Sequence, residues 1–135
     1  MGDGSSAQTE DVGAAFAKHG KVSYMQIPAT DTALAAAFYR DVFGWHLMDG
    51  GSADHRSFAD ASGDLIGAFV TSLTSVREPG VLPYVYVDGL DGVVESIKSH
   101  GGEIVRDTYA EGGLWVATFR DPAGNVMGVW TAGSR

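Results

Sequence analysis

The side chains in this sequence that are able to do chemistry are few, and several stand two positions apart in short apolar stretches. Tyr24 and Gln26 do so in "KVSYMQIP", and Tyr84 and Tyr86 do so in "LPYVYVD". Residues two apart in a strand project from the same face. Aromatic rings provide area for stacking, while hydroxyl and amide groups provide hydrogen bonds. These four residues are therefore candidates to hold and orient a flat, apolar small molecule.

Two of the four histidines, His46 and His55, flank a turn signal at Gly50 and Gly51. A two-residue hairpin turn at these glycines would pair residues whose numbers sum to 101, which predicts that His46 lies opposite His55. Such a pair has the chemistry to bind a metal ion or to transfer a proton near neutral pH. Two solvent-facing histidines beside a turn are the simpler interpretation, and the residues alone leave both open.

The composition of the chain argues against several classes of function. A formal net charge of −8 over 135 residues removes the basic surface that nucleic-acid binding requires. The absence of cysteine excludes disulfides, thiol catalysis and zinc–thiolate sites. The first twenty residues do not match a secretory signal, and no later stretch reaches the length of a membrane span. We therefore expect a cytoplasmic protein whose ligand is a small molecule, with no nucleic-acid or membrane partner.

The candidate residues fall into two halves of the chain that show the same order of expected elements. After a small, polar stretch, apolar periodicity and turn signals predict a strand, a helix and three short strands, and the second half repeats that order. The helix of the first half, "TDTALAAAFYRDVFG", has Thr30 or Asp31 as its cap and Gly44 as its end. The predicted boundaries are a flexible N-terminal arm at 1–20 and a single domain at 21–135, with modules at 21–72 and 82–132 joined by a linker at 73–81.

The repeat is also visible at the level of residues. "FADASGDLIGAF" from Phe58 aligns with "FRDPAGNVMGVW" from Phe119 at a constant shift of 61, which makes Gly67 equivalent to Gly128. Glycine is unusual inside a strand, so close backbone packing or room for a ligand are the two explanations that we consider. Asp121, before the turn proline, is interpreted as a turn and surface residue that accepts hydrogen bonds from nearby backbone amides.

Two tandem βαβββ units, with "IPATDTALAAAFYRDVFGW" in the first and "FRDPAGNVMGVW" in the second, resemble the vicinal oxygen chelate superfamily. That superfamily includes glyoxalase I, extradiol dioxygenases, fosfomycin-modifying enzymes and bleomycin resistance proteins. The similarity covers about Lys21 to Thr131. It implies an α+β fold in which the two modules form a curved, eight-stranded mixed sheet around a cavity. It also implies a homodimer, since members of the superfamily often dimerise.

Metal-dependent members of the superfamily place a histidine or glutamine on the first strand of each module and a glutamate on the last strand. The resemblance carries these four positions onto Tyr24, Leu82, Gly67 and Gly128. A divalent cation needs three or four oxygen or nitrogen ligands, which these residue types do not supply. We therefore expect no metal site and no cofactor.

The rest of the cavity lining follows from strand alternation if those four positions face the cavity. The full set of predicted ligand-binding residues is Tyr24, Gln26, Leu65, Gly67, Phe69, Leu82, Tyr84, Tyr86, Val126, Gly128 and Trp130. This lining is aromatic and largely apolar. The same residues are also ordinary components of a solid sheet core, because aromatic residues are favoured in strands.

These considerations predict a metal-independent protein that binds a small, apolar or aromatic molecule, in the manner of bleomycin-resistance-type sequestration. The alternative is a metal-free lyase, isomerase or cyclase acting on such a molecule, with Tyr24, Gln26, Tyr84 and His55 as candidate catalytic groups. A metal-dependent glyoxalase-like enzyme or dioxygenase is the third class, and the residue types at the ligand positions disfavour it.

Overall fold

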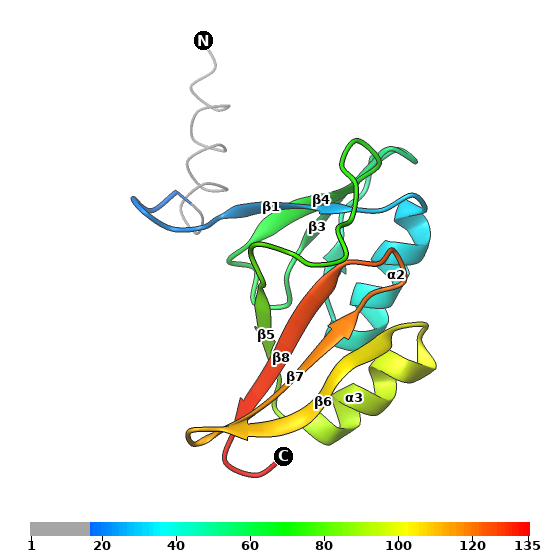
Figure 1. The fold of residues 1–135 in the computed structure, drawn as a ribbon. Coiled ribbons are helices and arrows are strands. Elements are labelled where there is room, and N and C mark those ends of the chain that lie inside the picture. The colour runs from blue at the N-terminus through cyan, green and yellow to red at the C-terminus, as the bar shows by residue number, and fades with distance from the viewer. Residues whose placement is uncertain (1–16) are drawn as a thin grey trace.

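The computed structural model describes residues 17–135, which form two βαβββ modules around a common core (Figure 1). The arm predicted at 1–20 falls mostly outside these residues. Within the described part of the chain, no helix has the length and apolar character needed to cross a membrane.

Each module contains one helix and four strands. The first comprises β1 (Tyr24–Pro28), α2 (Thr32–Phe43), β2 (His46–Leu47), β3 (His55–Ala59) and β4 (Ile66–Val70). The second comprises β5 (Tyr84–Tyr86), α3 (Leu90–Ser99), β6 (Glu103–Glu111), β7 (Leu114–Arg120) and β8 (Val126–Ala132).

The strand order is the same in the two modules, β1-β4-β3-β2 in one sheet and β5-β8-β7-β6 in the other. The first strand of each module pairs in parallel with the last, and the remaining pairs are antiparallel. The predicted α+β class and the tandem βαβββ modules are confirmed. Hydrogen bonding divides the eight strands into two sheets of four, and β1 and β5 each lie at the edge of their own sheet.

Helix α2 has the limits that its sequence predicts. The Asp31 side chain caps its first turn, because the carboxylate accepts a 3.0 Å hydrogen bond from the Leu34 amide. At the other end, Gly44 has a φ of 72°, in the left-handed region, and its amide donates to the carbonyl of Arg40. Between these ends the helix buries Phe38 and Tyr39 against the sheets.

Aromatic rings of both modules form the core. Tyr39 stacks on Trp45 and on Phe69, at centroid distances of 4.6 and 5.4 Å. Phe38 of the same helix contacts Phe119 of β7 at 6.0 Å. Helix α2 of the first module therefore packs on a strand of the second, and the two modules bury their apolar faces in one shared core.

The two glycines of the repeat, Gly67 and Gly128, do not occupy equivalent places. Gly67 pairs with Phe58, whereas the counterpart of Phe58 in the second module, Phe119, pairs with Met127. The turn between β3 and β4, which closes from Asp60 to Leu65, is one residue longer than the turn from Asp121 to Asn125. A shift of one residue moves a side chain to the other face of a sheet.

Gly67 consequently faces the core, where the Phe58 ring fills the space that a side chain would need. Gly128 faces the opposite side, beneath the ring of Tyr84. The expectation that Gly67 and Phe69 share a face with Tyr24 is wrong for the same reason. Phe69 is fully buried in the aromatic core, on the face of the sheet that carries Ile27.

Two further expectations are corrected. His46 pairs with Ala59, not with His55, because the loop of this hairpin is longer than two residues and His55 forms a bridge with Ser52. Asp121 does accept hydrogen bonds from backbone amides, but it is buried, with 3% of its surface exposed, and it is not a surface residue.

Candidate functional site

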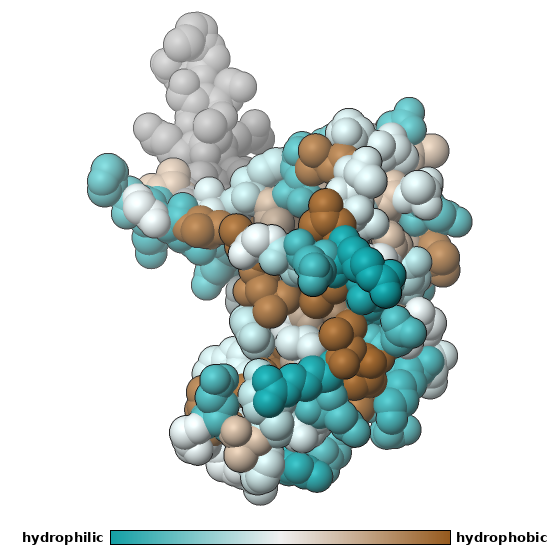
Figure 2. All heavy atoms as spheres, viewed as in Figure 1, coloured by the Kyte–Doolittle hydropathy of each residue, from teal (hydrophilic) through white to brown (hydrophobic). Residues whose placement is uncertain are grey.

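A cavity of about 640 Å³ lies between the two modules, where the edge strands β1 and β5 border it. Its walls include the end of α2, the following Trp45, and the turn between β3 and β4. Figure 2 shows hydrophobic residues gathered around the hollow between the upper and lower parts of the face drawn. Its aromatic and aliphatic lining includes Phe43, Trp45, Leu65, Tyr84, Tyr86 and Met127.

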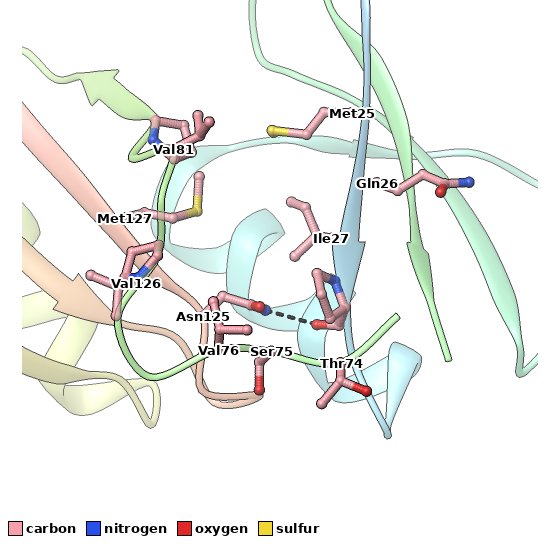
Figure 3. A pocket seen from close by; sticks show the side chains of 13 residues that line it. Met25, Gln26, Ile27, Thr74, Ser75, Val76, Val81, Asn125, Val126 and Met127 are labelled. Carbon is pink, nitrogen blue, oxygen red and sulfur yellow. Dashed lines mark hydrogen bonds between the residues drawn. The ribbon is translucent and has the colours of Figure 1, made fainter. Parts of the chain in front are cut away.

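A second cavity, of about 300 Å³, lies next to the first (Figure 3). Residues Thr74–Val81 of the linker form one side of it, and β1 and the start of β8 form the others. Met25, Pro83 and Met127 line both cavities. These three residues therefore lie where the two cavities adjoin, and we refer to them as the wall.

A hydrogen-bond network around Asp121 holds the wall in place and joins the modules. The Asp121 carboxylate accepts from the amides of Ala123 and Asn125 and from the Asn125 side chain, at 2.9, 2.9 and 3.0 Å. Asn125 also donates a 2.7 Å bond to the carbonyl of Pro28 in β1, drawn as the dashed line in Figure 3. The turn before β8 is thereby tied to the first strand of the other module.

Tyr39 completes this network from α2. Its hydroxyl donates to Asp121 at 2.8 Å and lies 2.7 Å from the sulfur of Met127. Burial raises the pKa of Tyr39 well above its ordinary value, and the charge of Asp121 and the hydrogen bond to it raise the pKa further. The phenol remains protonated at neutral pH and orients Met127 at the boundary of the two cavities.

Tyr84 is the other tyrosine with a shifted pKa. Partial burial raises its pKa, the neighbouring Tyr109 and Glu111 raise it further, and Arg106 opposes them. Its ring covers Gly128, and 45% of its surface is exposed. At neutral pH Tyr84 is therefore a hydrogen-bond donor rather than a base.

The structure divides the predicted site residues into groups. Leu65, Tyr84 and Tyr86 line the larger cavity. Val126 and Gln26 border the smaller one, but the Gln26 side chain lies on the side of β1 that faces away from it (Figure 3). The predicted residues outside both linings are Tyr24, Gly67, Phe69, Leu82, Gly128 and Trp130.

Most of these outlying residues have a clear structural setting. Tyr24 is 48% exposed, and its hydroxyl lies 3.5 Å from the Gln26 amide. Trp130 packs edge-on against Tyr86 at 4.9 Å. Leu82 is half-buried. The candidate catalytic residue His55 is exposed in β3 and lines neither cavity, so the structure does not bring it together with Tyr84.

Sequence reasoning missed several residues that line the cavities. Met25 and Met127 have the strand parity of core residues, Phe43 is the last residue of α2, and Trp45 follows the helix after its cap at Gly44. One signal in the sequence could have found the two methionines. Met25 stands next to Gln26 and Met127 stands next to Val126, and both of these neighbours were predicted to line the cavity. Nothing in the linker composition indicated that Thr74–Val81 would border a cavity.

The residues present do not fit a divalent metal at the positions that the superfamily uses. Tyr24 offers a phenol, Leu82 an aliphatic side chain, and Gly128 no side chain at all, while Gly67 faces the core. Elsewhere in residues 17–135, no three histidine, cysteine or acidic side chains lie close enough together to hold an ion. These four positions thus supply fewer oxygen or nitrogen ligands than a divalent cation needs.

Comparisons with known proteins agree with this fold. A family model described as the Glyoxalase/Bleomycin resistance protein/Dioxygenase superfamily matches residues 21–129. A glyoxylase-like domain-containing protein of Didymella fabae is 30% identical over 84% of this chain and 94% of its own length. The anthracycline biosynthesis protein DnrV of Streptomyces peucetius is 27% identical over 84% of this chain. The chain spans about half the length of DnrV and of two other curated relatives, 48% and 47% respectively.

Among solved structures, a glyoxalase/bleomycin resistance protein/dioxygenase family enzyme from Burkholderia phytofirmans PsJN superimposes with a TM-score of 0.72. It is 20% identical in sequence, and the match covers 84% of this chain and all of that one. This likeness concerns the fold alone.

Proposed function

The chain belongs to the glyoxalase/bleomycin resistance protein/dioxygenase superfamily, and from that premise we propose that it binds a small, apolar or aromatic molecule without a metal ion. The observation that carries the proposal is the cavity of about 640 Å³ between the modules, which is walled by aromatic and aliphatic side chains. Ligand pockets commonly enclose about 300–1,000 Å³ and combine an apolar wall with a few polar groups. Here Asp60, Ser62 and Asp88 are the polar residues of the lining.

The aromatic part of the wall favours a planar ligand. Phe43, Trp45, Tyr84 and Tyr86 line the same cavity, and offset or edge-on packing against such rings contributes about 0.5–1.5 kcal/mol per pair beyond burial. Each 100 Å² of apolar ligand surface removed from water adds about 2.5 kcal/mol. A ligand of two or three fused rings therefore gains enough to offset its loss of translational freedom.

Sequestration is the version of this function that the site supports best. No histidine lines the larger cavity within the described residues, and the pKa of Tyr84 is shifted away from neutrality. General acid–base catalysis works best with a group whose pKa lies near the working pH. The proposal therefore describes a protein that holds its ligand without converting it. We propose further that it does so as a homodimer in the cytoplasm.

A metal-free lyase, isomerase or cyclase is the second candidate. One finding favours it, namely that the relative from Streptomyces peucetius is named an anthracycline biosynthesis protein. An enclosing cavity assists such reactions by holding a reactive geometry. Turnover of an anthracycline-like substrate by this chain, with a defined pKa in its pH–rate profile, would favour the enzyme over sequestration.

The test is titration of the purified chain with N-phenyl-1-naphthylamine, an uncharged aromatic dye whose fluorescence rises in apolar surroundings. We expect saturable binding at one site per chain, with the same affinity in the presence of EDTA or of added zinc or manganese. Leu65→Trp fills the larger cavity and should weaken binding at least tenfold. Leu34→Trp is the matched control, because Leu34 is 52% exposed on α2 and lines neither cavity. Absence of saturable binding, or loss of binding with EDTA, contradicts the proposal.

A further inference from the structure

The two adjacent cavities have linings of different chemistry. Four aromatic residues border the larger one, whereas among residues 17–135 no aromatic and no charged side chain borders the smaller one. Figure 3 shows Met25 and Ile27 of β1 on one side of the smaller cavity and Met127 of β8 on the other, with their side chains directed into the space between. The surface of the smaller cavity is thus mainly aliphatic.

The polar side chains that border the smaller cavity do not alter this character. Ser75 and Asn125 donate hydrogen bonds to backbone carbonyls of the protein, at 3.0 and 2.7 Å. The side chains of Gln26 and Thr74 are directed away from the cavity in Figure 3. A ligand group with hydroxyl or carbonyl oxygens would therefore lose water here without gaining equivalent partners, whereas an aliphatic group carries no such cost.

The linker adds apolar surface that the protein itself leaves uncovered. Val76 and Val81 border the smaller cavity, and they are 56% and 84% exposed. Apolar area in contact with water is stabilised when another apolar group covers it. Each methylene of a ligand that is fully buried in such surroundings raises the affinity by about fourfold. An aliphatic group in this cavity therefore gains affinity from its own burial and from covering these valines.

The wall residues connect the two cavities through side chains that change shape easily. Methionine is unbranched and has three rotatable bonds, so it adapts to what packs against it. Met127 is restrained by the 2.7 Å contact of its sulfur with the Tyr39 hydroxyl, whereas Met25 is half-buried in the edge strand β1. Met25 is thus the side of the wall that yields at lower cost to a group extending from the larger cavity.

We propose that the ligand is a planar aromatic molecule with an aliphatic substituent. Its rings occupy the larger cavity, and the substituent passes Met25 into the smaller cavity, where it packs on Ile27 and on the valines of the linker. This inference rests on the proposed function, because it extends the site in which the rings bind and names the class of ligand more closely.

Three probes test the inference. The first is N-phenyl-1-naphthylamine, the second carries a butyl chain at the para position of its phenyl ring, and the third carries a 2-methoxyethyl chain of equal length there. We expect the butyl probe to bind at least tenfold more tightly than the bare one, and at least fivefold more tightly than the methoxyethyl probe. Leu65→Trp should weaken the binding of all three, because the rings of each occupy the larger cavity.

Two variants locate the butyl chain. Val81→Asp introduces a charge beside the smaller cavity at a largely exposed position, where the fold tolerates it. It should weaken binding of the butyl probe at least fivefold and leave that of the bare probe within twofold. Val105→Asp is the matched control, because Val105 is 49% exposed and lines neither cavity, and it should alter neither affinity.

The outcomes separate this inference from the proposed function. Equal affinities of the bare and butyl probes, or an equal effect of Val81→Asp on both, overturn the placement of the substituent and leave the proposed function standing. If none of the probes binds, the proposed function and the placement of the substituent are both overturned.

Discussion

The hydrogen bond from Tyr39 to Asp121 joins α2 of the first module to the turn before β8 of the second, and its removal is predicted to weaken the whole fold. In Tyr39→Phe the ring keeps its stacking partners, so the change isolates the hydroxyl. Tyr39 is fully buried, and its 2.8 Å bond to a carboxylate belongs to the charge-assisted class. Such bonds contribute about 1.5–3 kcal/mol to stability.

The size of the expected loss of stability depends on the hydrogen bonds that Asp121 keeps in Tyr39→Phe. Its carboxylate keeps the amides of Ala123 and Asn125 and the Asn125 side chain as donors, so the charge is not left unpaired in the core. We therefore expect the free energy of unfolding to fall by about 2 kcal/mol, within the range for hydrogen bonds to charged groups. For a chain of this size the melting temperature should fall by roughly 6–12 °C.

The shift in the pKa of Tyr39 adds a dependence on pH. Because burial and Asp121 raise the pKa in the folded state above the ordinary 10.0, the native protein retains a proton that the unfolded chain loses. Stability should then fall as the pH rises above about 10, since the unfolded state binds fewer protons there. In Tyr39→Phe, which has no titrating hydroxyl at this position, stability should fall less steeply with pH above about 10.

Urea denaturation followed by tryptophan fluorescence, at neutral pH and between pH 9 and 11, provides the measurement. Tyr86→Phe is the control, because Tyr86 is 52% exposed and no hydrogen bond of its hydroxyl is found in residues 17–135. The reasoning is refuted if Tyr39→Phe is as stable as the parent protein. It is also refuted if both variants keep the same alkaline slope.

Three further predictions concern the glycines and the link between modules. Gly67→Ala should destabilise strongly, by about 3 kcal/mol or more in urea denaturation, because a methyl group would meet the Met25 backbone and the Phe58 ring. Gly128→Ala should cost about 1 kcal/mol, since the part-exposed Tyr84 ring is able to move aside, and equal losses for the two glycines would contradict their different placement. Asn125→Ala removes the 2.7 Å bond to β1 and should cost about 1–2 kcal/mol, while hydrogen exchange at β1 should become faster.

Local patterns in the sequence were sufficient to predict the helix and strand order. The cap at Asp31 and the left-handed glycine at Gly44 act within a few residues of the helix that they delimit, so the sequence contains the whole signal. The same holds for strand alternation around Tyr24 and Gln26, whose side chains do share a face in β1.

The placement of the candidate site residues was predicted only in part. Leu65, Tyr84 and Tyr86 border the larger cavity, but Phe69 turned out to be a core residue. A repeat read at constant spacing does not reveal that one hairpin turn has an additional residue, and one residue is enough to exchange the two faces of a strand.

By itself, the sequence determined the family, the two modules and the residue types at the superfamily's metal positions, because each of these depends on composition or on neighbours along the chain. The tertiary structure decided which faces meet. The approach of Tyr39 to Asp121, 82 residues away, and the placement of Met25 and Met127 around the same cavity arise from the packing of one module on the other. Contacts between distant segments are set by the way in which whole faces bury each other, and no local pattern encodes them.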